Sequence, residues 1–258
     1  MTSNNTTTTT LVVGATGATG KWLVKLLLDQ GHHVRVIARS KDRMVSVLQE
    51  LDTEDQKTST DNLTIKEAAV LDLSDAELQE QVNGCNAVVS CLGHTMDFKG
   101  MYGHPRKLVT EVVRRLTDAI KVTAPTAKFI LMGTDAVANP NGQDDKRTFA
   151  ERSIIFLLRH LLPPHADNEA AAAYLHNTLG TNSGVEWSVV RPTDLINGSP
   201  TEKYQLFDKP QGGLIGSGVT TRANVAHCMT EFITNNEKWS EYKFKMPVIL
   251  DNVTAETN

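Results

Sequence analysis

Leu11-Val12-Val13 runs directly into Gly14-Ala15-Thr16-Gly17-Ala18-Thr19-Gly20, and the amphipathic stretch 21–28 follows. This order predicts a buried strand, a glycine-rich turn and the start of a helix. The first glycine lets the chain turn sharply, the second lets backbone N–H groups approach a ligand, and the third lets the helix pack close to the sheet. The positive end of the helix dipole then faces a phosphate group. The stretch therefore predicts a nucleotide diphosphate site formed by Gly14, Thr16, Gly17, Ala18, Thr19 and Gly20.

The composition favours a small-molecule role. The chain has 258 residues and a formal net charge of −4, so it is long enough for one α/β domain but has no basic field for a nucleic acid or an anionic membrane. It has three cysteines without Cys-x-x-Cys spacing, which suits a reducing compartment, and no apolar run of the ~18 residues that a membrane span needs. Residues 1–10 have neither the charges nor the apolar core of a targeting peptide, so we expect a disordered polar tail. A cytoplasmic protein is therefore expected.

Strand-like and helix-like segments alternate along the chain. Strands are expected at 11–13, 33–39, 63–70, 86–92, 128–132, 185–190 and 242–249. Helices are expected at 21–28, 42–51, 105–122, 167–179 and 223–234. This alternation predicts an α/β fold with a Rossmann-type doubly wound parallel sheet, in a single domain over residues 11–258. We expect a small C-terminal substrate lobe formed mainly from about 140–168 and 193–258.

The segment Phe149–Leu162 is apolar on most of its circumference and ends at Pro163-Pro164. A helix that is apolar all round is typical of a protein core. The alternative is a helix that forms the wall of an apolar pocket. We expect the core position.

The residue at the end of the second strand decides whether the bound adenosine ribose has a free 2′-hydroxyl or a 2′-phosphate. An acidic residue there would bond the 2′-hydroxyl and repel a 2′-phosphate. This chain has Arg39 followed by Ser40 and Lys41, and an arginine fork suits a phosphate, so the sequence predicts NADP(H). The alternative is that these side chains only form the solvated start of a helix. Asp72 either accepts a hydrogen bond from the adenine amine or caps the helix that begins near Ser74.

Further short motifs follow in order: Asp72-Leu73, Ser90-Cys91-Leu92-Gly93, Met132-Gly133-Thr134, Val190-Arg191-Pro192 and Thr221-Arg222-Ala223-Asn224-Val225-Ala226. Together with the glycine loop, this order resembles the atypical short-chain dehydrogenase/reductases of the NAD(P)H-binding, NmrA-like group. The resemblance covers nearly the whole chain from Leu11 onward. The group includes flavin and biliverdin reductases, isoflavone-reductase-like proteins and redox-sensing regulators, so the resemblance defines the cofactor more closely than the reaction. Many relatives have an aspartate at the position of Asn224.

The resemblance implies where the cofactor lies. NADP(H) would lie over the strand ends, with Leu92 and Gly93 near the linking phosphates and ribose and Pro192 near the nicotinamide carboxamide. The same cofactor-binding stretches include Leu73, Cys91 and Gly133. Thr134 stands where the catalytic serine of the family commonly lies, so its hydroxyl is expected to bond a substrate carbonyl.

The chain lacks the usual proton donor of the family. A typical short-chain dehydrogenase protonates its product through a Tyr-x-x-x-Lys pair. The fourth residue after each of the four tyrosines is Arg106, Thr178, Asp208 or Met246, never lysine. The remaining proton sources are His94, Tyr102, Tyr174, His176 or water.

Two functions remain open. One is an NADPH-dependent oxidoreductase acting on a small, apolar or conjugated acceptor, which needs little acid assistance. The other is a non-catalytic NADP(H)-binding sensor or regulator with a protein partner, since fold does not imply function. No set of His, Cys and carboxylate residues has metal-ligand spacing, so no metal is expected.

Overall fold

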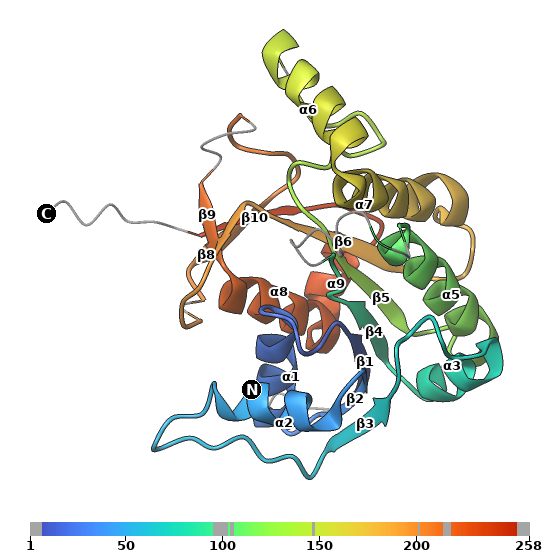
Figure 1. Cartoon of the computed structure of the whole chain (residues 1–258), viewed down its shortest axis with the longest axis vertical. Helices are drawn as coiled ribbons and strands as arrows, with labels where there is room; N and C mark the ends of the chain where they lie inside the picture. Colours follow the sequence, from blue (N-terminus) through green and yellow to red (C-terminus); the bar gives the residue numbers. More distant parts are fainter. Residues whose placement is uncertain are drawn as a thin grey trace, which may run out of the picture.

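The computed structural model describes residues 7–94, 103, 106–145, 148–200, 202–213 and 218–251. Its centre is an eight-stranded sheet in the order β3-β2-β1-β4-β5-β6-β10-β8, with helices on both faces (Figure 1). The strands are β1 (Thr9–Val13), β2 (His33–Ala38), β3 (Leu63–Glu67), β4 (Ala87–Ser90), β5 (Lys128–Met132), β6 (Trp187–Pro192), β8 (Tyr204–Phe207) and β10 (Val248–Asp251). Neighbouring strands pair in parallel except β8, which runs antiparallel to β10. The predicted doubly wound sheet is confirmed.

Helices cover the two faces of the sheet as separate layers, and one further helix projects from them. The helices of the described residues are α1 (Gly20–Asp29), α2 (Lys41–Gln49), α3 (Asp75–Val82), α5 (Leu108–Thr123), α6 (Phe149–Leu161), α7 (Pro163–Ala173), the π-helix η1 (Tyr174–Leu179), α8 (Arg222–Thr234) and α9 (Asn236–Tyr242). Buried side chains of α1, α2 and α8 pack on one face, and those of α5, α7 and η1 pack on the other. A short parallel pair, β7 (Asp194–Ile196) and β9 (Val219–Thr221), lies beside the main sheet.

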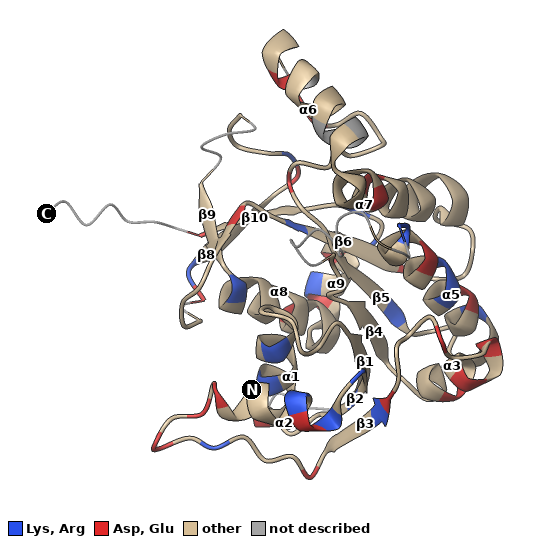
Figure 2. Cartoon of the chain, viewed as in Figure 1, with Lys and Arg blue, Asp and Glu red and all other residues tan. Residues whose placement is uncertain are grey.

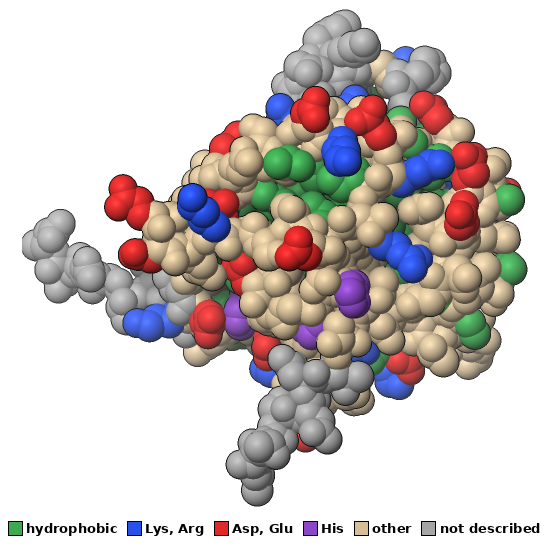
Figure 3. Space-filling model, turned by 90° about the horizontal axis from the view of Figure 1, so that it is seen from below, with side chains coloured by type: hydrophobic (Ala, Val, Ile, Leu, Met, Phe, Trp, Pro, Cys, Tyr) green, Lys and Arg blue, Asp and Glu red, His purple; other side chains and the backbone are tan. Residues whose placement is uncertain are grey.

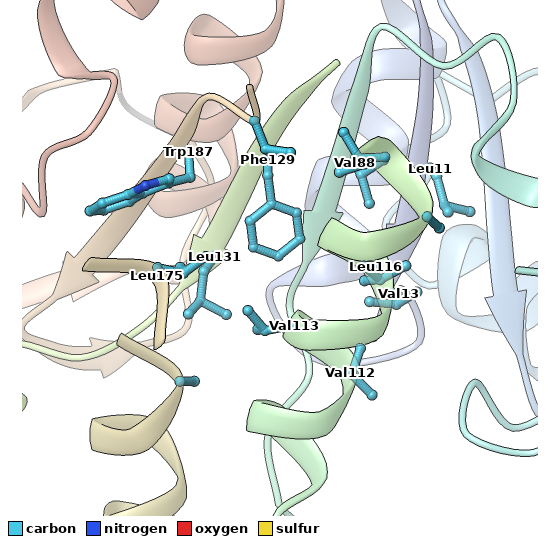
Figure 4. Close-up of a cluster of buried hydrophobic side chains, with 14 of the residues drawn as sticks. Leu11, Val13, Val88, Val112, Val113, Leu116, Phe129, Leu131, Leu175 and Trp187 are labelled. Carbon is cyan, nitrogen blue, oxygen red and sulfur yellow. The ribbon is translucent and has the colours of Figure 1, made fainter. Parts of the chain in front are cut away.

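The central strands are apolar on both sides because both sides are buried. Leu11 and Val13 of β1 belong to the cluster under α5, whereas Val12 belongs to the cluster under α1. Figure 4 shows the first cluster, in which Phe129 of β5 lies beside Val113 of α5. This burial explains the uninterrupted apolar runs in the sequence.

Several expected boundaries are wrong. β1 begins at Thr9, so the last residues of the expected tail pair in the sheet, and β3 ends at Glu67 rather than at Val70. The strand expected over 242–249 is wrong over 242–247, because α9 extends to Tyr242 and Phe244 has a φ of +61°, which strand residues do not adopt. β10 then begins only at Val248.

The core position expected for Phe149–Leu162 is also wrong. The segment forms α6, but α6 projects from the body of the molecule and packs against α7 (Figure 1). Phe149 and Phe156 are 85% and 61% exposed. The next helix begins at Pro163, earlier than the expected Asp167, because proline suits the first turn of a helix.

The C-terminal third contributes to the main body. β8 and β10 extend the eight-stranded sheet and α8 packs on α1, so these parts of the expected substrate lobe belong to the Rossmann layers. The role of the remaining lobe segments stays a prediction. Within the described ranges, no helix combines the length and the apolar character that crossing a bilayer requires. On the face shown in Figure 3, Lys and Arg side chains are scattered among Asp and Glu.

Candidate functional site

The glycine loop between β1 and α1 has the geometry of a cradle. Gly14 has a φ of +76°, and a Cβ there would lie 2.6 Å from the backbone carbonyl carbon of Cys91. A Cβ on Gly20 would overlap the carbonyl oxygen of Gly14. Gly17 is exposed, and its amide donates to the Gly14 carbonyl at 3.0 Å. Gly14 and Gly20 are therefore required by packing, whereas Gly17 leaves the outer side of the loop open.

The N-terminus of α1 keeps its amides available. Thr19 occupies the N-cap but makes no side-chain cap hydrogen bond. In the part of the chain that the structure describes, no acceptor is paired with the amides of Ala18 and Thr19. Thr16 is half-buried beside them. Unpaired amides at the positive end of a helix fit a diphosphate.

The other cofactor stretches lie at the same edge of the sheet. β1 pairs with β4, β4 with β5, and β5 with β6, all in parallel, so Leu92, Gly93, Thr134 and Pro192 come at neighbouring strand ends. A Cβ on Gly93 would meet no atom within 4 Å. The amide of Gly133 donates to the Val190 carbonyl at 2.8 Å, which joins the ends of β5 and β6. Open space therefore lies where the resemblance places the ribose.

Two residues of these stretches have buried side chains. Cys91 is buried, and burial raises the pKa of its thiol to about 12, so the thiol stays neutral. The backbone carbonyl of Cys91 lies against Gly14 at the base of the cradle. Leu73 is 5% exposed and belongs to the core cluster under α5. Their side chains support the site by packing.

Cations gather at the end of β2 and the start of α2 (Figure 2). Arg39 is exposed, and no described residue forms a hydrogen bond or ion pair with its guanidinium. The hydroxyl of Ser40 accepts from the amide of Arg43 at 3.2 Å, so Ser40 caps α2. One carboxylate was missed by sequence reasoning: Glu67 Oε2 accepts from the amide of Lys41 at 2.8 Å. The only sequence signal for it is its place at the end of the third strand.

The structure separates the two interpretations of Asp72. The N-cap of α3 is Ser74, which forms a capping box with Glu77. Asp72 lies exposed in the preceding turn, where its amide donates to the Ala69 carbonyl at 3.0 Å. The capping alternative is therefore wrong, and the adenine contact stays a prediction.

The candidate catalytic side chains do not all meet. Thr134 lies partly exposed at the end of β5, and its Oγ1 accepts from the Ala136 amide at 3.3 Å. Tyr174 begins η1, and its hydroxyl lies 3.4 Å from Oγ1 of Thr117, in the middle of α5. His176 packs edge-on against Trp187, at the start of β6 and thus at the opposite edge of the sheet. Of these side chains, Thr134 lies at the strand ends, whereas Tyr174 and His176 lie away from them. Tyr102 is outside the described residues.

His94 does lie at the strand ends, in a buried pair. Its Nε2 is 2.8 Å from Oδ2 of Asp167 on α7, and the two side chains are 4% and 0% exposed. The same carboxylate accepts from the amides of Val109 at 2.7 Å and Thr110 at 3.0 Å, in the first turn of α5. Thr110 Oγ1 donates to Asp167 Oδ1 at 2.6 Å. Asp167 was missed by sequence reasoning, because a contact across 73 residues leaves no periodic signal.

Comparisons with known proteins agree with this geometry. The model of the NAD(P)H-binding family matches residues 14–236. A short-chain dehydrogenase/reductase (wide type) from Veillonella parvula, solved in complex with NADP, is 14% identical with a TM-score of 0.62 over 96% of this chain and 97% of that chain. A protein named an NADH-flavin reductase from Streptococcus pneumoniae is 16% identical with a TM-score of 0.62 over 95% and 99%. The anaerobillin reductase ChuY from Escherichia coli O157:H7 is 14% identical with a TM-score of 0.61 over 95% and 98%.

At these identities the structures show the fold. No protein of curated function matches the sequence. Among the described residues, no group of three or more His, Cys, Asp and Glu side chains is placed to hold a metal ion.

Proposed function

The chain belongs to the NAD(P)H-binding family, and from that premise we propose that it is an NADPH-dependent oxidoreductase that reduces a small, apolar or conjugated acceptor. One observation carries the proposal: the glycine cradle, Gly93 and Thr134 all lie at the ends of the neighbouring parallel strands β1, β4 and β5. When bound, NADPH supplies a hydride from C4 of its nicotinamide. The names of two structural neighbours, a flavin reductase and an anaerobillin reductase, support a reduction, and a flavin is a conjugated acceptor.

The residues divide the work of binding and orientation. The amides of Ala18 and Thr19 face the diphosphate, and Arg39 provides a guanidinium for the 2′-phosphate. The hydroxyl of Thr134 donates to the acceptor oxygen and holds it at the strand ends. The cofactor is NADP(H) rather than NAD(H) in this proposal, because Arg39 stands where an acidic residue would repel the phosphate.

Arg39→Ala tests the choice of cofactor. We expect NADPH affinity to fall about 10- to 100-fold, since a hydrogen bond between charged groups contributes about 1.5–3 kcal/mol. NADH affinity should change less than about twofold, because its ribose has no phosphate at this position. Both dissociation constants are measured by titration calorimetry. The matched control is Arg43→Ala, which removes an exposed cation of α2 three residues after the Ser40 cap. Equal losses for both cofactors would refute the phosphate contact.

A sensor without chemistry is the second candidate. The missing Tyr-x-x-x-Lys pair and the distance of Tyr174 from the strand ends favour it. NADPH oxidation at micromolar protein is measured against menadione, 9,10-phenanthrenequinone, FMN and cinnamaldehyde. Oxidation with at least one acceptor supports the oxidoreductase. A protein that binds NADPH and oxidises it with none of these acceptors would instead support the sensor.

A further inference from the structure

We propose that α5 carries a self-complementary surface through which two copies of this chain associate as a twofold-symmetric dimer. The surface is a row of four charged residues, Glu111, Arg114, Asp118 and Lys121, on the solvent side of the helix. This dimer goes beyond the oxidoreductase function and does not depend on it.

The four side chains form one continuous row along α5. They follow one another at intervals of three, four and three residues, which is the spacing of neighbours on a helix surface. The row is about 15 Å long at a rise of 1.5 Å per residue. The four side chains are between 38% and 48% exposed, whereas Val113 and Leu116 of the same helix are buried. Acidic and basic residues alternate along this side of α5 (Figure 2).

The order of the charges decides how two copies can meet. Along the chain the row reads acidic, basic, acidic, basic. When two such helices lie antiparallel across a twofold axis beside Leu116, Glu111 of one copy is opposite Lys121 of the other. Arg114 is likewise opposite Asp118. Because a twofold axis repeats each contact, the pairing brings together four pairs of opposite charge. In a parallel pairing each residue would face its own kind, so the charge order favours the antiparallel dimer.

The same charges already pair within the helix, which holds them in the row. Arg114 Nη2 lies 2.6 Å from Oε1 of Glu111, and its Nη1 lies 3.1 Å from Oδ2 of Asp118. Lys121 Nζ lies 3.3 Å from Oδ1 of Asp118. A carboxylate accepts several hydrogen bonds and a guanidinium or ammonium donates several, so these groups keep capacity for a second copy. Several charges in one network contribute more than isolated exposed pairs.

The surroundings of the row also suit a second copy. A cavity of about 100 Å³ lies between α3 and α5, beside Arg114 and Asp118. Val122 borders this cavity and is 66% exposed, so the region has an apolar side chain that association would cover. The row has two acidic and two basic residues and no net charge. Two copies can therefore approach along it although the chain has a formal net charge of −4.

Glu111→Lys tests the charge pairs. The wild-type protein should form a concentration-dependent dimer in sedimentation equilibrium between about 1 and about 500 µM, a range that covers weak association. Its dissociation constant should rise between about 0.05 and about 0.5 M NaCl, because salt screens exposed charges. Glu111→Lys turns two of the four attractions into repulsions, so we expect the dissociation constant to rise at least about 10-fold. Glu54→Lys, the same change in the exposed loop after α2, is the matched control and should leave it unchanged.

Two recharged variants test the symmetry of the pairing. Arg114→Glu with Lys121→Glu makes the row entirely acidic, and Glu111→Lys with Asp118→Lys makes it entirely basic. Each variant alone should sediment as a monomer. An equal mixture should form a heterodimer, because every residue of one row then faces the opposite charge. Circular dichroism checks that each variant is folded.

A further variant excludes attraction through net charge alone. Glu54→Lys with Asp55→Lys gives the chain the same net charge as the basic-row variant but changes the exposed loop after α2 instead of α5. Mixed with the acidic-row variant, this control should leave both proteins monomeric. A heterodimer with the control would overturn the α5 pairing.

Carbodiimide coupling locates the contact. The reagent joins a lysine amine to a carboxylate that touches it, without a spacer. In the dimer band of the wild-type protein, mass spectrometry should identify a bond between Lys121 and Glu111. Within one copy, the carboxylate paired with Lys121 is that of Asp118, so a bond to Glu111 reports the second copy.

Three results would overturn the proposal. The first is a wild-type protein that stays monomeric over the whole concentration range. The second is a dimer that Glu111→Lys leaves intact. The third is a dimer that Phe156→Ser weakens and Glu111→Lys does not, which would place the interface on the exposed apolar residues of α6. The oxidoreductase function is tested separately, because these experiments measure association and not turnover.

Discussion

At the scale of single residues, Glu67 should weaken the binding of a 2′-phosphate at the proposed Arg39 site. Its carboxylate accepts from the Lys41 amide at 2.8 Å, and Glu67 pairs in the sheet with Ala38, the residue before Arg39. A 2′-phosphate at the start of α2 would therefore meet a negative charge beside the arginine. Glu67→Gln removes this charge and keeps an oxygen for the Lys41 amide. We expect NADPH affinity to rise about fivefold, since a unit charge about 4 Å away in water contributes ~1 kcal/mol.

Titration of NADPH and NADH at two salt concentrations checks the expectation. The gain for NADPH should shrink at high salt, because exposed charges are screened. Glu80→Gln, an exposed carboxylate on α3, is the control and should leave both affinities unchanged. If Glu67→Gln changed NADPH and NADH binding equally, the 2′-phosphate would not lie beside Glu67.

The residues that sequence reasoning missed share one property. The cradle and the neighbouring strand ends are predictable, because glycine spacing and strand order place them at one edge. Glu67 and Asp167 were missed because each forms a hydrogen bond with a residue that is distant in the chain. The Val190-Arg191-Pro192 motif is a related case. Its arginine is buried and donates to both carboxylate oxygens of Asp144, so its role is structural, which a motif alone does not reveal.

At the scale of elements, α6 shows what a hydrophobic pattern predicts and what it omits. The pattern predicts a helix, and α6 is a helix of 13 residues. It does not identify the surface that the apolar side chains meet, and here several of them face outward. The sheet strands carry more information, because unbroken apolar runs between turns imply burial on both faces.

Substitution of exposed α6 side chains should therefore leave the stability of the fold unchanged. Phe156 and Leu157 are 61% and 56% exposed. Their replacement by serine therefore removes little buried apolar surface from the fold. We expect Phe156→Ser and Leu157→Ser to shift Tm by less than about 2 °C. Leu116→Ala in α5 is the comparison: Leu116 is 0% exposed, and its loss should cost about 2–5 kcal/mol. Thermal unfolding by circular dichroism measures both. A large Tm loss in the α6 variants would mean that the side chains of Phe156 and Leu157 are buried in solution.

At the scale of the whole molecule, stability should depend on pH through one buried histidine. His32 lies between α1 and β2, is 1% exposed, and accepts at Nδ1 from the Thr8 amide at 3.2 Å. His33 completes the link, since its amide donates to the Thr8 carbonyl at 2.9 Å. The two bonds fasten the start of β1 to the start of β2. Burial, and secondarily the charge of His33, lowers the pKa of His32 from its ordinary value of 6.5.

The sign of the pH effect follows from this direction. The unfolded chain binds a proton at His32 near pH 6.5, whereas the folded chain resists it until lower pH. The contribution of His32 to the free energy of unfolding should thus be constant above that pH and fall as the pH drops below it. Urea unfolding at pH 7.5 and pH about 5.5, above the range where carboxylates titrate, measures the difference. His32→Asn, whose Oδ1 can accept from the Thr8 amide, should remove most of the difference. His33→Asn, an exposed control, should keep most of it, because burial is the larger cause. If His32→Asn unfolded with the same pH dependence as the wild type, the acid sensitivity of this fold would originate at another site.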